Sequence, residues 1–123
     1  MKFISLLLAT LCLSSAALAV GTWKTLANET LWPNAPYFRE IMIPNTEEFS
    51  VVRIYVAMGS LRVQNATVMT DKLVQLPLWT LQGDYRSPRT ADATFIPSKL
   101  RSIRLDMRSL ETTTPTRVQI LVR

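Results

Sequence analysis

The chain has 123 residues, of which 48% are hydrophobic and 19% charged, and its formal net charge is +5. This composition is typical of a globular domain and is too apolar for a disordered chain. Histidine is absent, and the only cysteine, Cys12, lies in the leader described below. Zinc or copper sites, disulfides and His- or Cys-based nucleophiles are therefore not expected. We expect no metal, no cofactor and no enzymatic activity; calcium between loops and a carboxylate pair are the remaining alternatives.

Residues 1–19 have the pattern of a cleaved signal peptide. Lys2 provides a basic start, an apolar run follows, and Ala17-Leu18-Ala19 forms the small-x-small cleavage site. We expect cleavage after Ala19 and a periplasmic or secreted protein. No later apolar run has transmembrane length, so no transmembrane segment is expected after cleavage. Lipid attachment at Cys12 is the alternative, and the bulky Leu11 before it disfavours this.

Residues 20–49 are expected to form an N-terminal segment of the single domain 20–123. An edge strand is predicted at residues 23–26, and an irregular Trp/Pro loop at residues 28–36. Residues 38–43 form the next predicted strand, which ends at a Pro-Asn pair.

Residues 50–123 are expected to form the core of the domain. Residues 51–57 alternate between apolar and polar side chains, as a half-buried strand does. Residues 61–70 predict a long strand with a bulge at Asn65, where the alternation breaks.

The middle of the chain gives weaker signals. Residues 79–82 and 94–96 are predicted as short strands, the second ending at Pro97. Between them, residues 83–92 form the longest polar stretch and are predicted to be a surface loop.

Two regular strands close the chain. Residues 100–108 and 117–123 alternate clearly, and the polar segment 110–115 separates them. We expect these two strands to form an antiparallel hairpin with a long loop.

The pattern predicts an all-β fold: a single antiparallel β-sandwich of about seven or eight strands after the cleaved signal peptide. No window has a helical apolar stripe. The predicted core is Ile54, Val56, Val63, Val68, Ile103, Leu105, Met107, Val118, Ile120 and Val122.

Arginine supplies most of the positive charge, and residues 51–123 carry the net excess. Five arginines occupy the polar phase of predicted strands: Arg53, Arg62, Arg104, Arg108 and Arg117. If these strands are neighbours, one sheet face presents a basic comb with Asp106 inside it. Two interpretations remain open: cross-strand ion pairs on a solvated face, or a docking face for an acidic partner.

Further binding residues are expected outside the comb. Arg86 and Arg89 flank Pro88 in the predicted loop, and Tyr55 lies on the strand face opposite Ile54 and Val56. Exposed tryptophans and tyrosines could stack on a sugar or bind a protein partner, whereas core or edge packing is their more common role.

The last third of the chain resembles the closing hairpin of small exported bacterial β-sandwich proteins of uncharacterised function. The resemblance rests on the segment from Phe95 to Ser109, followed by Arg117-Val118-Gln119-Ile120-Leu121-Val122, and it extends over residues 50–123. The segment here lacks an extra residue between Ile103 and Leu105 and the family's usual glycines. The resemblance implies a β-sandwich in the cell envelope and no particular chemistry.

These features favour an exported, non-catalytic interaction module. We expect it to dock on another envelope or secreted protein through a sheet edge or an arginine-bearing face. The alternative is recognition of an anionic glycan or lipid surface by arginines together with Trp and Tyr. Nucleic acid is not expected as a partner of an exported protein.

Overall fold

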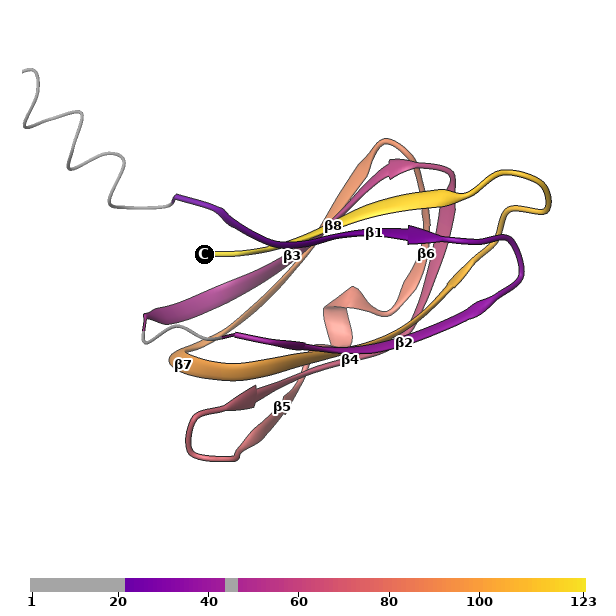
Figure 1. The fold of residues 1–123 in the computed structure, drawn as a ribbon. Coiled ribbons are helices and arrows are strands. Elements are labelled where there is room, and N and C mark those ends of the chain that lie inside the picture. Colours follow the sequence, from indigo (N-terminus) through magenta and orange to yellow (C-terminus); the bar gives the residue numbers. More distant parts are fainter. Residues whose placement is uncertain (1–21, 44–46) are drawn as a thin grey trace, which may run out of the picture.

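Residues 22–43 and 47–123 are described by a computed structural model, shown as a ribbon in Figure 1. The elements are β1 (Lys24–Leu31), β2 (Pro36–Met42), β3 (Glu48–Met58), β4 (Ser60–Thr70), β5 (Gln75–Pro77), the 3-10 helix η1 (Trp79–Leu81), β6 (Gly83–Arg86), β7 (Arg89–Ser109) and β8 (Thr116–Val122). No α-helix occurs in these two ranges, so the predicted all-β class is confirmed. The predicted signal peptide, residues 1–19, lies outside the described residues. Within the described residues, no helix is long and apolar enough to cross a membrane.

All strand pairs are antiparallel, and they join into one eight-stranded sheet in the order β1-β8-β3-β7-β4-β5, with β2 paired to β7 and β6 paired to β4. The 21-residue strand β7 has two roles in this sheet. Its first half pairs with β3, and its second half lies between β2 and β4. Figure 1 shows β7 bending at one end of the molecule, so that its halves run along different sides. The predicted division into two separate sheets stays a prediction.

Several predicted strands are confirmed. Strand β3 contains the predicted residues 51–57, and β1 lies at one end of the strand order, as expected of an edge strand. Strand β2 covers most of the predicted 38–43 segment. Strand β4 spans the predicted long strand, and its register against β7 shifts between Val63 and Asn65, which confirms the bulge.

The predicted hairpin between the last two strands is wrong. Strand β8 pairs with β1 and β3, whereas the second half of β7 pairs with β2 and β4. The connection 110–115 is six residues long, enough extended chain for about 20 Å. It therefore carries the chain from the second half of β7, between β2 and β4, to the position of β8 between β1 and β3.

Three local predictions also need correction. Residues 79–81 form η1 rather than a strand, because Leu78 and Leu81, three residues apart, are both buried. The predicted loop at 83–92 consists of β6, a turn at Ser87-Pro88 and the start of β7. Strand β7 continues through Pro97, and β1 extends to Leu31 into the region predicted as irregular.

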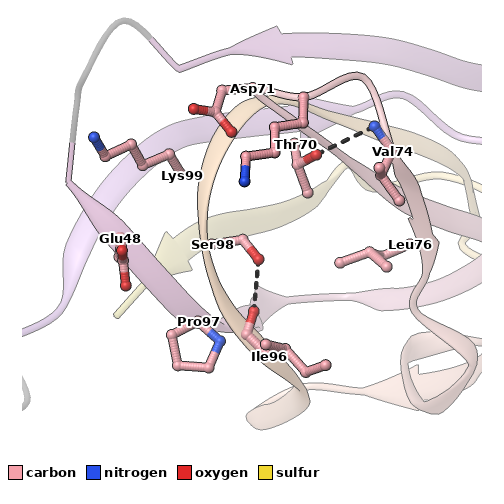
Figure 2. A pocket seen from close by; sticks show the side chains of 10 residues that line it. Glu48, Thr70, Asp71, Val74, Leu76, Ile96, Pro97, Ser98 and Lys99 are labelled. Atoms are coloured by element: carbon pink, nitrogen blue, oxygen red, sulfur yellow. Dashed lines mark hydrogen bonds between the residues drawn. The ribbon is translucent and has the colours of Figure 1, made fainter.

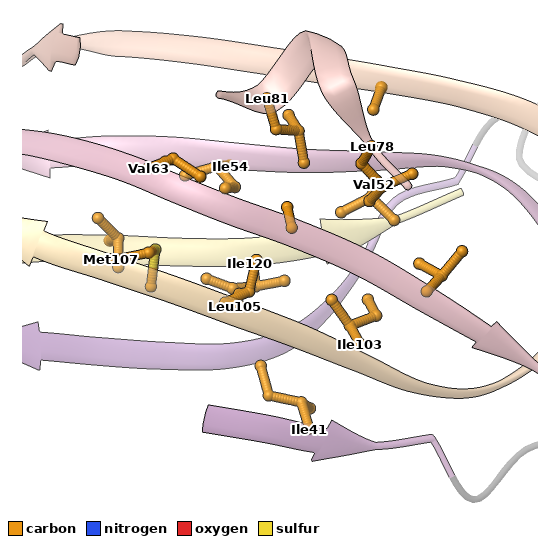
Figure 3. Packing of buried hydrophobic residues seen from close by; sticks show 14 of the residues in the cluster. Ile41, Val52, Ile54, Val63, Leu78, Leu81, Ile103, Leu105, Met107 and Ile120 are labelled. Carbon is orange, nitrogen blue, oxygen red and sulfur yellow. The ribbon is translucent and has the colours of Figure 1, made fainter. Parts of the chain in front are cut away.

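The core confirms the phase of the predicted strands. All ten predicted core side chains are buried, each at most 2% exposed. Ile54, Ile120, Ile103 and Leu105 belong to one hydrophobic cluster, which Figure 3 shows in part, so β3 and β8 share a core with the second half of β7. Leu61 and Leu81 are fully buried core residues that the prediction did not include.

The edge strands β1 and β2 each carry a charged residue on the face that points toward the core. Glu29 is opposite Val118, and Arg39 is opposite Leu105, so both share the phase of buried residues. Their side chains form an ion pair with each other. Inward-pointing charges of this kind protect a sheet edge against pairing with another chain.

Candidate binding surface

Arg53 forms a bidentate ion pair with Asp92. Its Nε donates to Asp92 Oδ1 at 2.7 Å, and its Nη2 donates to Asp92 Oδ2 at 2.9 Å. The two residues are directly opposite on β3 and β7. The hydrogen bonds from Arg53 hold the pKa of Asp92 below its ordinary value of 3.8, with burial of the carboxyl acting in the opposite sense.

Two further predicted site residues are also paired across strands. Arg62 makes bidentate hydrogen bonds to Asp84 on β6, at 2.9 and 3.1 Å. Arg104 Nε donates to Glu40 Oε2 on β2 at 3.3 Å. These contacts favour the interpretation of Arg53, Arg62 and Arg104 as cross-strand ion pairs on solvated faces.

The predicted single comb of arginines is divided between two parts of the sheet. Arg62 and Arg108 are directly opposite on β4 and β7, and Asp106 and Arg104 continue the same face of β7. Arg53 and Arg117 instead lie on the neighbouring strands β3 and β8. The division follows from the pairing of β8 with β3 rather than with β7.

Three turns of the chain are joined at one end of the molecule. Ser87 N donates to Gly59 O at 2.9 Å, and Leu110 N donates to Ser60 O at 3.0 Å. Because Leu31 is opposite Thr116, the β1–β2 turn reaches the same end, as Figure 1 shows for the connections 32–35 and 110–115. We call this region, formed by residues 32–35, 58–60, 87–88 and 110–115, the turn end.

Four arginines stand at strand termini beside the turn end: Arg86, Arg89, Arg108 and Arg117. In the described part of the chain, none of them forms an ion pair with a carboxylate. The Arg89 guanidinium lies over the Tyr85 ring at 5.6 Å, a cation–π distance. The turn segments themselves contain one acidic residue, Glu111. The turn end together with these four flanking arginines therefore carries a net positive charge.

Aromatic residues have different roles around the sheet. Trp32, in the turn end, is 65% exposed. The Trp23 ring instead contacts two guanidinium groups, whose carbons lie 4.0 Å (Arg53) and 4.6 Å (Arg123) from the ring centroid. Tyr55 is half-buried on β3, on the face predicted for it. Among these residues only Trp32 offers an open ring beside the unpaired arginines.

Sequence reasoning missed one aromatic residue on the sheet face. Phe38, on β2, is 71% exposed. It lines a hollow of about 190 Å³ together with Asn65, Thr67, Gln75, Arg104 and Asp106. Ile41 and Ile43 are buried, and alternation from them places Phe38 on the outer face. This alternation along residues 38–43 was the sequence signal that could have identified Phe38 as an exposed residue.

A larger hollow of about 450 Å³ lies where β7 bends, lined in part by Leu76, Ile96 and Pro97 (Figure 2). Its rim carries both signs of charge, including Glu48 and Lys99. In this hollow the Ser98 hydroxyl donates to the Ile96 carbonyl at 2.8 Å. The Ser98 side chain is thus engaged with the backbone of β7.

Groups of three or more metal-ligating side chains are not found among the described residues. No known protein family matches the chain, and neither the curated proteins nor the solved structures contain a significant match. The resemblance to small exported bacterial β-sandwich proteins therefore stays a prediction.

Proposed function

We propose that this protein is an exported, non-catalytic interaction module that docks on an acidic surface of another envelope or secreted protein. The observation that carries the proposal is the group of arginines beside the turn end, which have no carboxylate partner among the residues that the structure describes. Arg53, Arg62 and Arg104 are already engaged by acids of the same chain. Arg86, Arg108 and Arg117 keep their full hydrogen-bonding capacity for a partner's carboxylates.

The proposal includes export after cleavage at Ala19 and a fold in which two layers of the sheet enclose the core. The leader pattern supports export. The two-layer arrangement is supported by β7 and β8, which do not pair with each other although both supply side chains to one core. A rigid β-scaffold that presents turns at one end is a common basis for binding.

Co-purification of a partner with the processed protein tests the function. The test variant combines Arg86→Gln, Arg108→Gln and Arg117→Gln, all at the turn end. We expect a defined acidic protein to be retained from native envelope or secreted material by the wild type, and its Kd to rise about tenfold or more in the variant. Rising salt should weaken the interaction moderately.

A matched control removes the same charge elsewhere. Lys72 follows the end of β4, and Lys99 and Arg101 lie near the middle of β7, away from the turn end; these three residues form no ion pair in the described part of the chain. Replacing all three with glutamine should leave the Kd within about twofold of wild type. Equal weakening by both triple variants would mean that net charge alone drives capture and would contradict a turn-end site.

A second candidate function is binding to an anionic lipid or glycan surface, favoured by the exposed Trp32 beside the arginines. Vesicles containing phosphatidylglycerol and a heparin column are suitable probes. This candidate predicts steep loss of binding with salt and a clear loss in Trp32→Ala. Protein docking instead predicts saturable binding to one partner in the absence of vesicles.

A further inference from the structure

The hollow beside Phe38 is built from aligned residues of three neighbouring strands. Phe38 on β2 is directly opposite Asp106 on β7, and Asp106 is directly opposite Asn65 on β4. The next row places Arg104 opposite Thr67. Since neighbouring strands are about 4.8 Å apart, the ring and the Asn65 amide stand about 10 Å apart across the Asp106 carboxylate.

The β-bulge on β4 determines that Asn65 belongs to this face. Regular alternation from the buried Val63 would turn residue 65 inward. Instead Gln64 and Asn65 are both exposed and Ala66 is buried, and the register against β7 shifts at this point. Bulges commonly re-aim a side chain next to a functional site. Here the bulge adds an amide, which is both donor and acceptor, to the hollow.

The lining groups are chemically suited to a sugar ring. The Phe38 ring is 71% exposed and offers a flat apolar surface for the C–H face of a pyranose. Asp106 forms no ion pair or side-chain hydrogen bond in the described ranges, so its carboxylate is open to hydroxyl donors. The Arg104 guanidinium is held by Glu40 through Nε, which leaves its other N–H groups as donors.

We propose that this hollow is a binding site for a neutral glycan, with one pyranose stacked on Phe38 and its hydroxyls bonded to Asn65 and Asp106. Arg104 is already paired with Glu40, so the Asp106 carboxylate is the remaining charge of the lining, which favours a neutral sugar over an acidic one. Thr67 and Gln75 extend the polar lining toward β5 for a second sugar unit. The site goes beyond the docking function, because it uses none of the unpaired arginines at the turn end.

The experiment uses the processed protein with defined neutral probes: cello-, xylo-, malto-, manno- and chito-hexaose, each titrated by NMR. Because the hollow is shallow, we expect one of them to bind with a Kd of about a millimolar or below. Phe38→Ala should weaken that binding at least about tenfold, and Phe38→Tyr, which keeps the ring face, should retain it. Both changes are at an exposed position, so the melting temperature should stay within a few degrees of wild type.

Trp79→Ala is the matched control, since Trp79 is 68% exposed and lies outside the hollow. It should leave sugar binding unchanged. Failure of every neutral probe to bind, or equal losses in Phe38→Ala and Trp79→Ala, would overturn the proposal. Binding of heparin alone, unaffected by Phe38→Ala, would also overturn it. None of these three results would bear on protein docking, which is tested with the arginine variants.

Discussion

Ser109 and Thr116 join the two ends of the connection between β7 and β8 through their hydroxyl groups, which lie 2.8 Å apart. Both residues are buried, at 1% and 0% exposure. Thr116 Oγ1 also donates to the Ser60 carbonyl at 2.9 Å, so the contact extends to the start of β4. Gly59, at φ +82°, passes so close that a Cβ there would lie 2.7 Å from Thr116 Oγ1. This buried group fixes the turn end on which the unpaired arginines stand.

Thr116→Val should therefore lower the free energy of unfolding by about 1–3 kcal/mol, because it keeps the shape but removes the buried hydroxyl and its hydrogen bonds. Urea unfolding at pH 7 measures the change. Thr30→Val, at an exposed position on β1, is the control and should be near neutral. If Thr116→Val and Thr30→Val had the same free energy of unfolding, the Thr116 hydroxyl would not stabilise the turn end, and the prediction would be wrong.

Asp92→Asn should reduce the acid sensitivity of the protein. The pKa of Asp92 is held below 3.8, chiefly by its hydrogen bonds from Arg53. The ion pair therefore stabilises the fold above about pH 3.8, and this contribution is lost as the pH falls further, through the lowered pKa. The Asp92 side chain is 38% exposed, so solvent screening limits the effect to about 1 kcal/mol or less.

The free energy of unfolding, measured from pH 6 to pH 2.5, checks this prediction. Wild type should lose more stability below pH 3.8 than Asp92→Asn does. Asp71→Asn, at an exposed turn position without an ion pair in the described residues, should follow the wild-type curve. Parallel curves for wild type and Asp92→Asn would argue against the pairing with Arg53.

Tyr37→Phe should leave the protein as stable as wild type at pH 7, or up to about 1 kcal/mol more stable. The reason is that the Tyr37 hydroxyl is buried and has no hydrogen-bond partner within residues 22–43 and 47–123. Burial also raises the pKa of Tyr37 from 10.0 to about 12. The unfolded chain ionises first, so wild-type stability should fall as the pH rises above 10. The variant should lose less stability over this range.

Denaturant unfolding at pH 7 and pH 11 tests both parts of this prediction. Tyr55→Phe serves as the control. Unlike the Tyr37 hydroxyl, the Tyr55 hydroxyl is not among the buried groups that lack a hydrogen bond in the described residues. If Tyr37→Phe were clearly less stable than wild type at pH 7, the Tyr37 hydroxyl would have to make a stabilising hydrogen bond, and the prediction would be wrong.

The alternation of apolar residues was enough to predict which strand faces are buried, but not which strands are neighbours. Ile103, Leu105 and Ile120 were placed correctly in the core because a half-buried strand needs one apolar face. The same pattern is satisfied whether β8 pairs with β7 or, as observed, with β1 and β3. The hairpin prediction failed for this reason, and a six-residue connection allows both outcomes.

The sequence predicted which arginines face outward, but not which of them pair with acidic residues. Arg53 and Arg62 were recognised as outward-facing, yet their partners Asp92 and Asp84 are 39 and 22 residues away in sequence. Ion pairing across strands depends on register, which the sequence pattern does not specify. The free arginines could be separated from the paired ones only after these neighbours were known.

Hydrogen exchange of the processed protein, alone and with its captured partner, tests the docking surface most directly. Docking at the turn end predicts slower exchange on binding at residues 58–60, 86–89 and 108–117, and little change at 70–75 and 96–101. Slower exchange confined to the second pair of segments, with the turn end unaffected, would contradict the proposed function.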